Sequence, residues 1–319
     1  MKLNETLERY RQAGLKSAEF TMSKQQPDGG YIWEGFVKDA YHKQPYSWGV
    51  SGFYAPIHRL LNWVKKNTLQ PKGGLKDYNG DVYKQSWFFQ GCHRAARFDI
   101  SYPIMEFLLS CQRPCGGLPH FQKDAVCRSL ATAWTGVSAL YIGRLDIAEK
   151  VSEWCIKLLD QPAQKKFFFQ TANDGTLLTD DTEPKGQFID FAKPNQCYWE
   201  LSLPWMLMGR MYMATGEKEF LDHAEKFFEI HLRFFEDRFH WVGSGKSSLA
   251  AAIHYLNTGD TRARDGVHEF LTFLVDTQHP EGGWCSETEQ DIPLIHIDHA
   301  AEFNVWIQED VNILAAMKA

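Results

Sequence analysis

The stretch TQHPEGGW, residues 277–284, is one copy of a phrase that recurs along this chain. Earlier copies occupy residues 25–31 (QQPDGGY), 69–75 (LQPKGGL) and 111–118 (CQRPCGGL), and residues 173–177 (NDGTL) form a degenerate copy. The second glycine lies at Gly30, Gly74 and Gly117 in the first three copies, a spacing of 44 and then 43 residues. A period of this length indicates a repeat protein. Proline cannot continue a helix and paired glycines adopt positive φ, so each copy is expected to end a helix and begin a loop.

Two helix-like segments separate successive copies, the first apolar on nearly all sides and the second amphipathic. The pairs are 46–55 with 56–67, 81–96 with 100–111, 124–142 with 145–160, 195–214 with 218–235, and 245–257 with 261–277. Thr-Gly-Glu at 215–217 and Thr-Gly-Asp at 258–260 are typical of a turn between two helices. A helix that is apolar all round is buried all round, so we expect the first helices to form an inner ring and the second an outer ring.

The two ends of the chain complete the pattern. Residues 4–24 predict an outer helix with no inner partner before it, and residues 300–318 predict an inner helix with no outer partner after it. Paired with each other, they make the sixth unit of an all-α, closed (α/α)6 toroid. We therefore expect one domain over residues 1–319. The alternative is an open solenoid, which would need polar caps at both ends.

Composition excludes several classes of protein. The chain has 319 residues, a net charge of −6 and 14% aromatic residues. We expect no nucleic-acid partner, because the chain is acidic. We expect a small molecule as the substrate. No apolar stretch is long enough to cross a bilayer, and the start of the chain lacks the apolar region of a secretory signal. Seven cysteines without a metal-finger spacing indicate free thiols in the cytosol. The oligomeric state stays open.

The Gln-x-x-x-Gly-Gly-Trp phrase of residues 278–284 resembles the repeat of the terpenoid cyclase and protein prenyltransferase superfamily of α/α toroids. This resemblance implies a central cavity lined by inner-helix side chains, many of them aromatic. Other (α/α)6 toroids are glycosidases, unsaturated-sugar hydrolases and sugar epimerases, so the fold does not decide the activity. The acid motif Asp-x-Asp-Asp-Thr of class II cyclases has its nearest match in LTDDT, residues 178–182, which lacks the first Asp. The zinc set of the prenyltransferases has no match.

The segment before the last inner helix carries a dense group of catalytic residue types. Asp298, His299 and Glu302 could act as acid and base, and with His296 they could also bind a metal, although we expect no metal and no cofactor. The structural alternative is helix capping by Asp298.

Glu200 lies inside an apolar helix, where a carboxylate must be paired or have a raised pKa. It is a candidate acid, and the alternative is an ion pair with Arg94 or Arg128. His93 is expected to orient the reacting groups. The candidate substrate-binding residues are Tyr46, Trp48, Trp87, Arg94, Arg128, Tyr198, Trp199 and Trp306. Residues 243–248 (GSGKSS) lack the first glycine of a P-loop, so a capping role is expected there.

These features favour an enzyme. The first hypothesis is a cyclase or isomerase that acts on a mostly apolar small molecule and is not initiated by a DxDD acid. The alternative is a carbohydrate-active hydrolase, lyase or epimerase with paired carboxylates. A non-catalytic binding protein is the third hypothesis.

Overall fold

The computed structural model describes residues 3–31, 41–162, 164–180, 187–284 and 293–317. These residues form twelve α-helices, four short β-strands and four 3-10 turns, so the chain is all-α in class. None of the helices in this part of the chain is long and apolar enough to cross a membrane. The residues group into two compact units, one made of residues 1–80, 84–107 and 271–319 and the other of residues 81–83 and 108–270.

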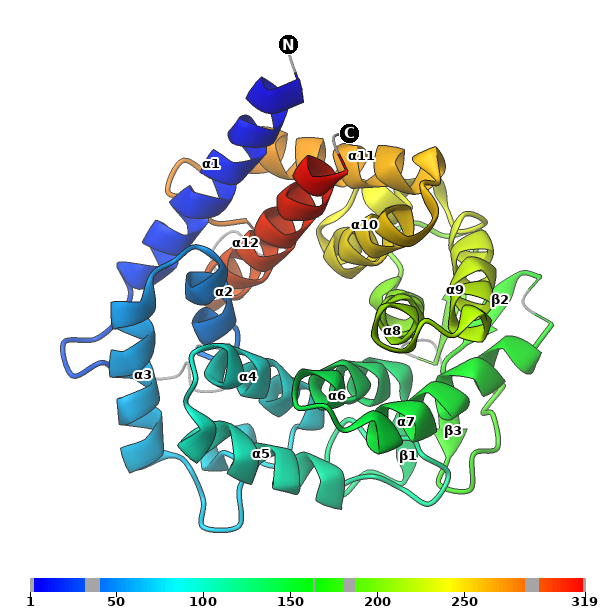
Figure 1. Ribbon diagram of the computed structural model, residues 1–319, viewed down its shortest axis with the longest axis horizontal. Helices are drawn as coiled ribbons and strands as arrows, with labels where there is room; N and C mark the ends of the chain where they lie inside the picture. Colours follow the sequence, from blue (N-terminus) through cyan, green and yellow to red (C-terminus); the bar gives the residue numbers. More distant parts are fainter. Residues whose placement is uncertain (1–2, 32–40, 163, 181–186, 285–292, 318–319) are drawn as a thin grey trace. The chain divides into compact units, whose positions relative to one another are not determined.

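The first unit contains both ends of the chain. Its helices are α1 (Leu3–Met22), α2 (Gln44–Val50), α3 (Tyr54–Asn67), most of α4 (Val82–Arg94) and α5 (Phe98–Ser110), and α12 (Pro293–Ala316). The last helix, α12, packs along α1 and also against α2 (Figure 1). Ser17 Oγ donates to the carbonyl of Ala300 at 3.2 Å, and Gln308 Nε2 donates to the carbonyl of Arg11 at 3.3 Å. Helix α1 and helix α12 are thus bonded to each other.

The second unit is built around α8 (Trp199–Thr215). This helix packs against α6 (Ser129–Tyr141), α7 (Leu145–Lys157), α9 (Lys218–His231) and α10 (Gly245–Thr258). The first part of α11 (Thr261–Thr277), as far as Phe270, also belongs to this unit. Most residues of α6, α8 and α10 are buried, whereas α7 and α9 alternate buried and exposed positions. This division follows from the sequence, because only the first helix of each pair is apolar on all sides.

Several predicted helix boundaries were wrong, among them the ends of the helices predicted at 145–160 and 218–235, which lie at Lys157 and His231. The third inner helix begins at Ser129 and not at 124, because β1 (Val126–Arg128) precedes it and pairs with β3 (Gln170–Ala172). The fourth begins at Trp199 and not at 195, since Asn195 has a φ of 56° that ends any helical run. Helix α2 ends at Val50, shorter than the predicted 46–55, and α12 begins at Pro293, earlier than the predicted 300. Strands β2 (Lys166–Phe168) and β4 (Phe188–Asp190) form a second antiparallel pair.

The recurring glycine phrase forms the same loop at each complete copy. In each, the first glycine donates its N–H to the carbonyl three residues earlier, as Gly116 does to Arg113 and Gly282 does to His279. Gly116 has a φ of +93°, and a Cβ there would lie 2.5 Å from the carbonyl oxygen of Lys150 in α7. A Cβ at Gly282 would likewise lie 2.7 Å from the carbonyl oxygen of Lys16 in α1. Glycine is therefore required where each loop lies on the backbone of an outer helix.

Candidate active site

Glu200 and Arg128 form a buried ion pair at the start of two neighbouring helices of the second unit. Arg128 is the N-cap residue of α6 and Glu200 lies in the first turn of α8. The Arg128 Nε donates to Glu200 Oε1 at 2.6 Å, while the Ser129 hydroxyl and the Leu130 N–H both donate to Oε2, at 2.5 and 2.9 Å. Glu200 is fully buried. Both of its oxygens are engaged, so Glu200 is arranged to hold Arg128 and the start of α6 rather than to contact a substrate.

The guanidinium of Arg128 faces solvent on its other side. A quarter of the side chain is exposed, and no other group in the described part of the chain accepts a hydrogen bond from it. The attraction of Glu200 raises the pKa of Arg128 further, so its charge is permanent. It lies 5.5 Å from the centre of the Phe169 ring. A fixed guanidinium with free terminal N–H groups suits a carboxylate or a developing oxyanion.

His120 is a neutral base candidate beside this pair, and its sequence context did not mark it as one. Its Nε2 lies 3.8 Å from Asp81 Oδ2, and the Val82 N–H donates to its carbonyl oxygen at 2.8 Å. Burial lowers the pKa of His120 from 6.5, and the charge of Arg128 lowers it too, while Asp81 and Glu200 act in the opposite sense. The net result is a neutral imidazole at pH 7, and 24% of its side chain is exposed.

Aromatic rings and a lysine complete this group of residues. Lys246 Nζ lies 5.7 Å from the centre of the Tyr83 ring and 6.0 Å from that of Trp199. Trp199 is partly exposed and stacks on Trp241. Tyr198, its neighbour in sequence, is fully buried, donates its hydroxyl to Asp237 and stacks on Phe234. Of these two neighbouring aromatic residues, only Trp199 thus has surface available to a ligand.

The first unit contains a second charged group, centred on Lys43. Its Nζ lies 2.6 Å from Asp298 Oδ2 and 2.6 Å from Glu302 Oε2, and only 4% of the residue is exposed. Burial opposes the charge of Lys43, but Asp298 and Glu302 outweigh it and raise its pKa. Trp306, one turn further along α12, donates from Nε1 to Glu302 Oε1 at 3.1 Å. A lysine ammonium therefore lies between the two carboxylates for which a metal was considered.

One carboxylate oxygen of the Lys43 group has no hydrogen-bond donor among the described residues. Asp298 Oδ1 is buried and accepts no hydrogen bond from a described residue, and it lies 3.8 Å from His42 Nε2. Because α12 begins at Pro293, Asp298 lies in the second turn and not at the N-cap. The side chain of His296 lies outside the described residues, as do residues 181 and 182 of the LTDDT segment.

Arg94 and Tyr46 also belong to the first unit. The Arg94 Nη2 donates to Tyr46 Oη at 2.8 Å and to Glu309 Oε1 at 2.9 Å, and the Tyr46 hydroxyl donates to the same carboxylate oxygen at 3.0 Å. The rings of Trp87 and Trp306 are 5.1 Å apart and fully buried. These two tryptophans are core residues and offer no surface to a ligand.

Three further predicted site residues pack between helices of the first unit. His93 Nδ1 lies 3.2 Å from the hydroxyl of Ser101 in α5. His299 Nδ1 lies 3.2 Å from the carbonyl oxygen of Trp284. Trp48 Nε1 donates to the hydroxyl of Thr21 in α1 at 2.9 Å. The structure thus places His299 against the Trp284 carbonyl and His93 against Ser101.

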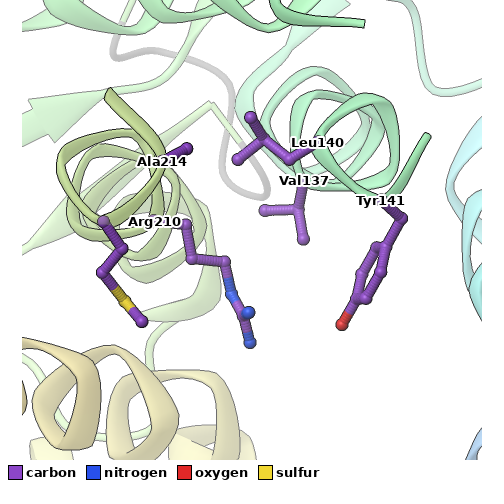
Figure 2. A pocket seen from close by; sticks show the side chains of 6 residues that line it. Val137, Leu140, Tyr141, Arg210 and Ala214 are labelled. Carbon is purple, nitrogen blue, oxygen red and sulfur yellow. The ribbon is translucent and has the colours of Figure 1, made fainter. Parts of the chain in front are cut away.

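A pocket of about 240 Å³ lies at the far ends of α6 and α8 from Arg128 and Glu200 (Figure 2). Four apolar side chains, one guanidinium and one phenol line it; they are Val137, Leu140, Met213, Ala214, Arg210 and Tyr141. Tyr141 of α6 and Arg210 of α8 supply the polar groups of this pocket. The pocket is distinct from the Arg128 site, because the two lie at opposite ends of these helices.

A group of possible metal ligands lies elsewhere in the second unit. Glu225, His254 and Asp260 bring their ligand atoms within 4.8 Å of one another. Arg262 already lies 2.6 Å from Asp260 Oδ2, and Trp205 Nε1 donates to His254 Nδ1 at 3.4 Å. That bond places the ring proton on Nε2, the atom that faces Glu225, so this nitrogen has no lone pair for a metal.

Comparisons with known proteins agree on the fold. Neither a family model nor a curated protein matches the sequence. A D-mannose isomerase matches with a TM-score of 0.71 at 12% identity, over 94% of this chain and 96% of the other. The GH76 α-mannanase of Bacteroides thetaiotaomicron matches with a TM-score of 0.70 at 12% identity, over 96% of this chain and 97% of the other. The type II terpene cyclase MstE of Scytonema, in complex with geranylgeranyl dihydroxybenzoate, matches with a TM-score of 0.66 at 10% identity, over 98% of this chain and 100% of the other. The chain has the (α/α)6 toroid fold that these enzymes share, as the repeat predicts.

Proposed function

We propose that this chain is an enzyme that moves a proton on a small hydroxylated substrate, an isomerase or epimerase of a sugar or sugar acid. The observation that carries the proposal is the placement of His120 and Arg128 on two backbone segments that are bonded to each other, since the Arg128 N–H donates to the Leu118 carbonyl at 2.9 Å. His120 faces Asp81, and Glu200 holds the guanidinium of Arg128. A neutral imidazole can accept a proton at pH 7, and a guanidinium can stabilise the negative charge that results.

The reaction assigns one role to each group. Because His120 Nδ1 is buried, Nε2 is the nitrogen that takes the proton from the carbon next to a carbonyl, and electron density moves to the carbonyl oxygen. The terminal N–H groups of Arg128 donate to that oxygen, and Glu200 keeps the guanidinium in place. Asp81, 3.8 Å from His120 Nε2, stabilises the imidazolium until the proton returns to carbon. In isomerisation, the proton of the adjacent hydroxyl passes to the former carbonyl oxygen, and His120 returns its proton to the former carbonyl carbon. In epimerisation, the enediolate turns so that its opposite face meets His120, which then returns the proton to the original carbon.

The ion pairs favour this chemistry over reactions that begin with a carboxylic acid. Glycoside hydrolysis and proton-initiated cyclisation both need a protonated carboxyl group. Glu200 faces Arg128, and Asp298 and Glu302 both face Lys43. Each of these three carboxylates is bound by a cation of the chain and so holds that cation in place, which is a positioning role rather than that of a free acid.

The fold is compatible with a sugar substrate. The similar solved structures include a D-mannose isomerase, α-1,6-mannanases and an unsaturated glucuronyl hydrolase, all of which are named for a sugar or a sugar acid. Their identity to this chain is 8–14%, so they support the fold directly and the substrate class only by analogy.

A cyclase or isomerase that acts on an apolar substrate is the second candidate. Trp199 favours it, because its partly exposed ring is stacked on Trp241 and can shield a cationic or polyene intermediate. This candidate needs no base at His120. The His120→Gln variant therefore separates the two candidates.

A substrate panel tests the proposal. The chain is incubated with aldoses, ketoses and uronic acids on one side and with polyprenyl compounds on the other, and products are identified by NMR. We expect conversion of a sugar or sugar acid, reduced about 100-fold in Arg128→Lys because the planar fork of donors is lost. Conversion of polyprenyl compounds alone would favour the second candidate, and ligand binding without any conversion would reject both enzymes.

A further inference from the structure

Two cysteines of the second unit lie in direct contact. The Sγ atoms of Cys115 and Cys127 are 3.9 Å apart. Cys115 lies in the glycine loop that follows α5, and Cys127 is the middle residue of β1. The chain between them folds back on itself, since the Arg128 N–H donates to the carbonyl of Leu118 at 2.9 Å. A Cβ at Gly117 would lie 2.8 Å from Cys127 Cβ, which shows how closely the two segments approach.

The two thiols differ in their exposure to solvent. Cys127 is fully buried, and burial together with the neighbouring Cys115 raises its pKa to about 12. Cys115 is partly exposed. Reaction with a reagent from solvent therefore begins at Cys115, and Cys127 is held beside it as the second thiol.

We propose that Cys115 and Cys127 form a disulfide when the chain meets a low-molecular-weight disulfide such as oxidised glutathione. The Cys115 thiolate attacks one sulfur of the reagent, forms a mixed disulfide and releases the first small thiol. Cys127 then loses its proton and attacks Cys115 Sγ, which forms the internal bond and releases the second small thiol. The two protein sulfurs are oxidised by two electrons in total, the reagent is reduced to two thiols, and the protons end on those thiols.

The geometry requires only a local adjustment. The sulfurs must close from 3.9 Å to about 2.05 Å, a change that side-chain rotation can supply between segments already bonded through their backbones. Arg113 holds the same loop, because its Nη2 donates to the carbonyls of Gln122 and Asp124 at 2.9 and 3.0 Å. The bond closes a loop that contains His120 and ends next to Arg128, so oxidation restrains the backbone at the proposed site.

The test uses the full chain and needs no substrate, so its outcome is independent of the proposed activity. Reduced protein is incubated with oxidised glutathione, and its mass, its thiol content and the position of the bond are measured. We expect the loss of two thiols and of the mass of two hydrogen atoms, with residues 115 and 127 linked in the peptide map. Amide hydrogen exchange over residues 116–126 is expected to slow by about 10-fold or more in the oxidised form.

Two variants complete the design. Cys127→Ala should stop at the mixed disulfide of Cys115 with glutathione, whereas the control Cys155→Ala, which removes a fully buried thiol, should form the internal bond like the parent chain. A parent chain that retains all its thiols, stays as a glutathione adduct or links other cysteines would overturn the proposal. The mass and peptide map of the parent chain decide this even where a variant folds poorly.

Discussion

Arg128 Nε and Glu200 Oε1 lie 2.6 Å apart, with Glu200 fully buried and Arg128 a quarter exposed. This one contact joins the N-cap residue of α6 to the first turn of α8 and aims the guanidinium outward. The carboxylate that looked like a catalytic acid in an apolar helix is thus placed to position an arginine. The chemistry of the site then depends on Arg128 and on the neutral His120 beside it.

The Glu200→Gln variant tests this contact through stability. The substitution removes the charge that compensates Arg128 and places an amide N–H₂ among three donors. We expect a loss of about 2 kcal/mol in the free energy of unfolding, measured by urea denaturation. The control Glu229→Gln breaks an ion pair with Arg262 in which both side chains are 51% exposed, and should cost about 0.5 kcal/mol. Equal costs for the two variants would contradict the buried ion pair.

The glycine loop makes a second prediction. Gly116→Ala forces a side chain into the left-handed region and toward the Lys150 carbonyl oxygen at 2.5 Å, so we expect a loss of about 3 kcal/mol or more. Gly216→Ala is the matched control, because Gly216 also has a positive φ, +74°, but a Cβ placed there would have no neighbouring atom within 4 Å. It should lose only about 1 kcal/mol. If thermal unfolding showed the same loss for both, the contact with α7 would not be the reason for the glycine.

Buried histidines predict sensitivity to acid. Burial lowers the pKa of His231 from 6.5 to about 3, and no described residue hydrogen-bonds to its ring nitrogens. Between pH 6.5 and pH 3 the unfolded chain binds a proton that the folded chain does not, so stability falls as pH falls through this window. The slope contributed by one such histidine is about 1.4 kcal/mol per pH unit. His231→Phe, in a cluster of aromatic rings, should have a shallower acid limb in urea titrations across this window, and an unchanged slope would argue against a neutral His231.

The raised pKa of Lys43 predicts behaviour at alkaline pH. A raised pKa in the folded chain means that the stability from this charge is complete below pH 10.5, the ordinary value, and is lost as the pH rises above it. Lys43→Met should lose about 3 kcal/mol at pH 7, because two carboxylates are left without their cation. The gap between parent and variant should narrow in urea titrations above pH 10.5. A constant gap would mean that the lysine acts through packing alone.

Local features were predictable from the sequence, whereas long-range pairings were not. The phrase of residues 277–284 fixes its loop through proline and glycine within eight residues, and α11 has the predicted limits Thr261–Thr277. Strand β1 was missed because its partner β3 lies some forty residues further on and its own three residues carry too little pattern. The partner of Lys43 is Asp298, 255 residues away.

The residues of the candidate active site were also only partly predictable from the sequence. Arg128 was one of two arginines named as partners for Glu200, and only the structure chose between them. His120 had no periodicity to mark it. Its place in the segment that leads into α6 was the available signal, since loops before buried helices carry many of the charged side chains of this chain.

The most direct test of the account is the uptake of deuterium from D₂O at the carbon next to the carbonyl of a sugar or sugar acid, followed by proton NMR. A base at His120 predicts that the parent chain incorporates deuterium at this carbon and that His120→Gln does so at least about 100-fold more slowly. Tyr141→Phe, which alters the separate pocket at the far end of α6, should match the parent chain. Undiminished deuterium uptake in His120→Gln, or none in any sugar with the parent chain, would contradict the central claim.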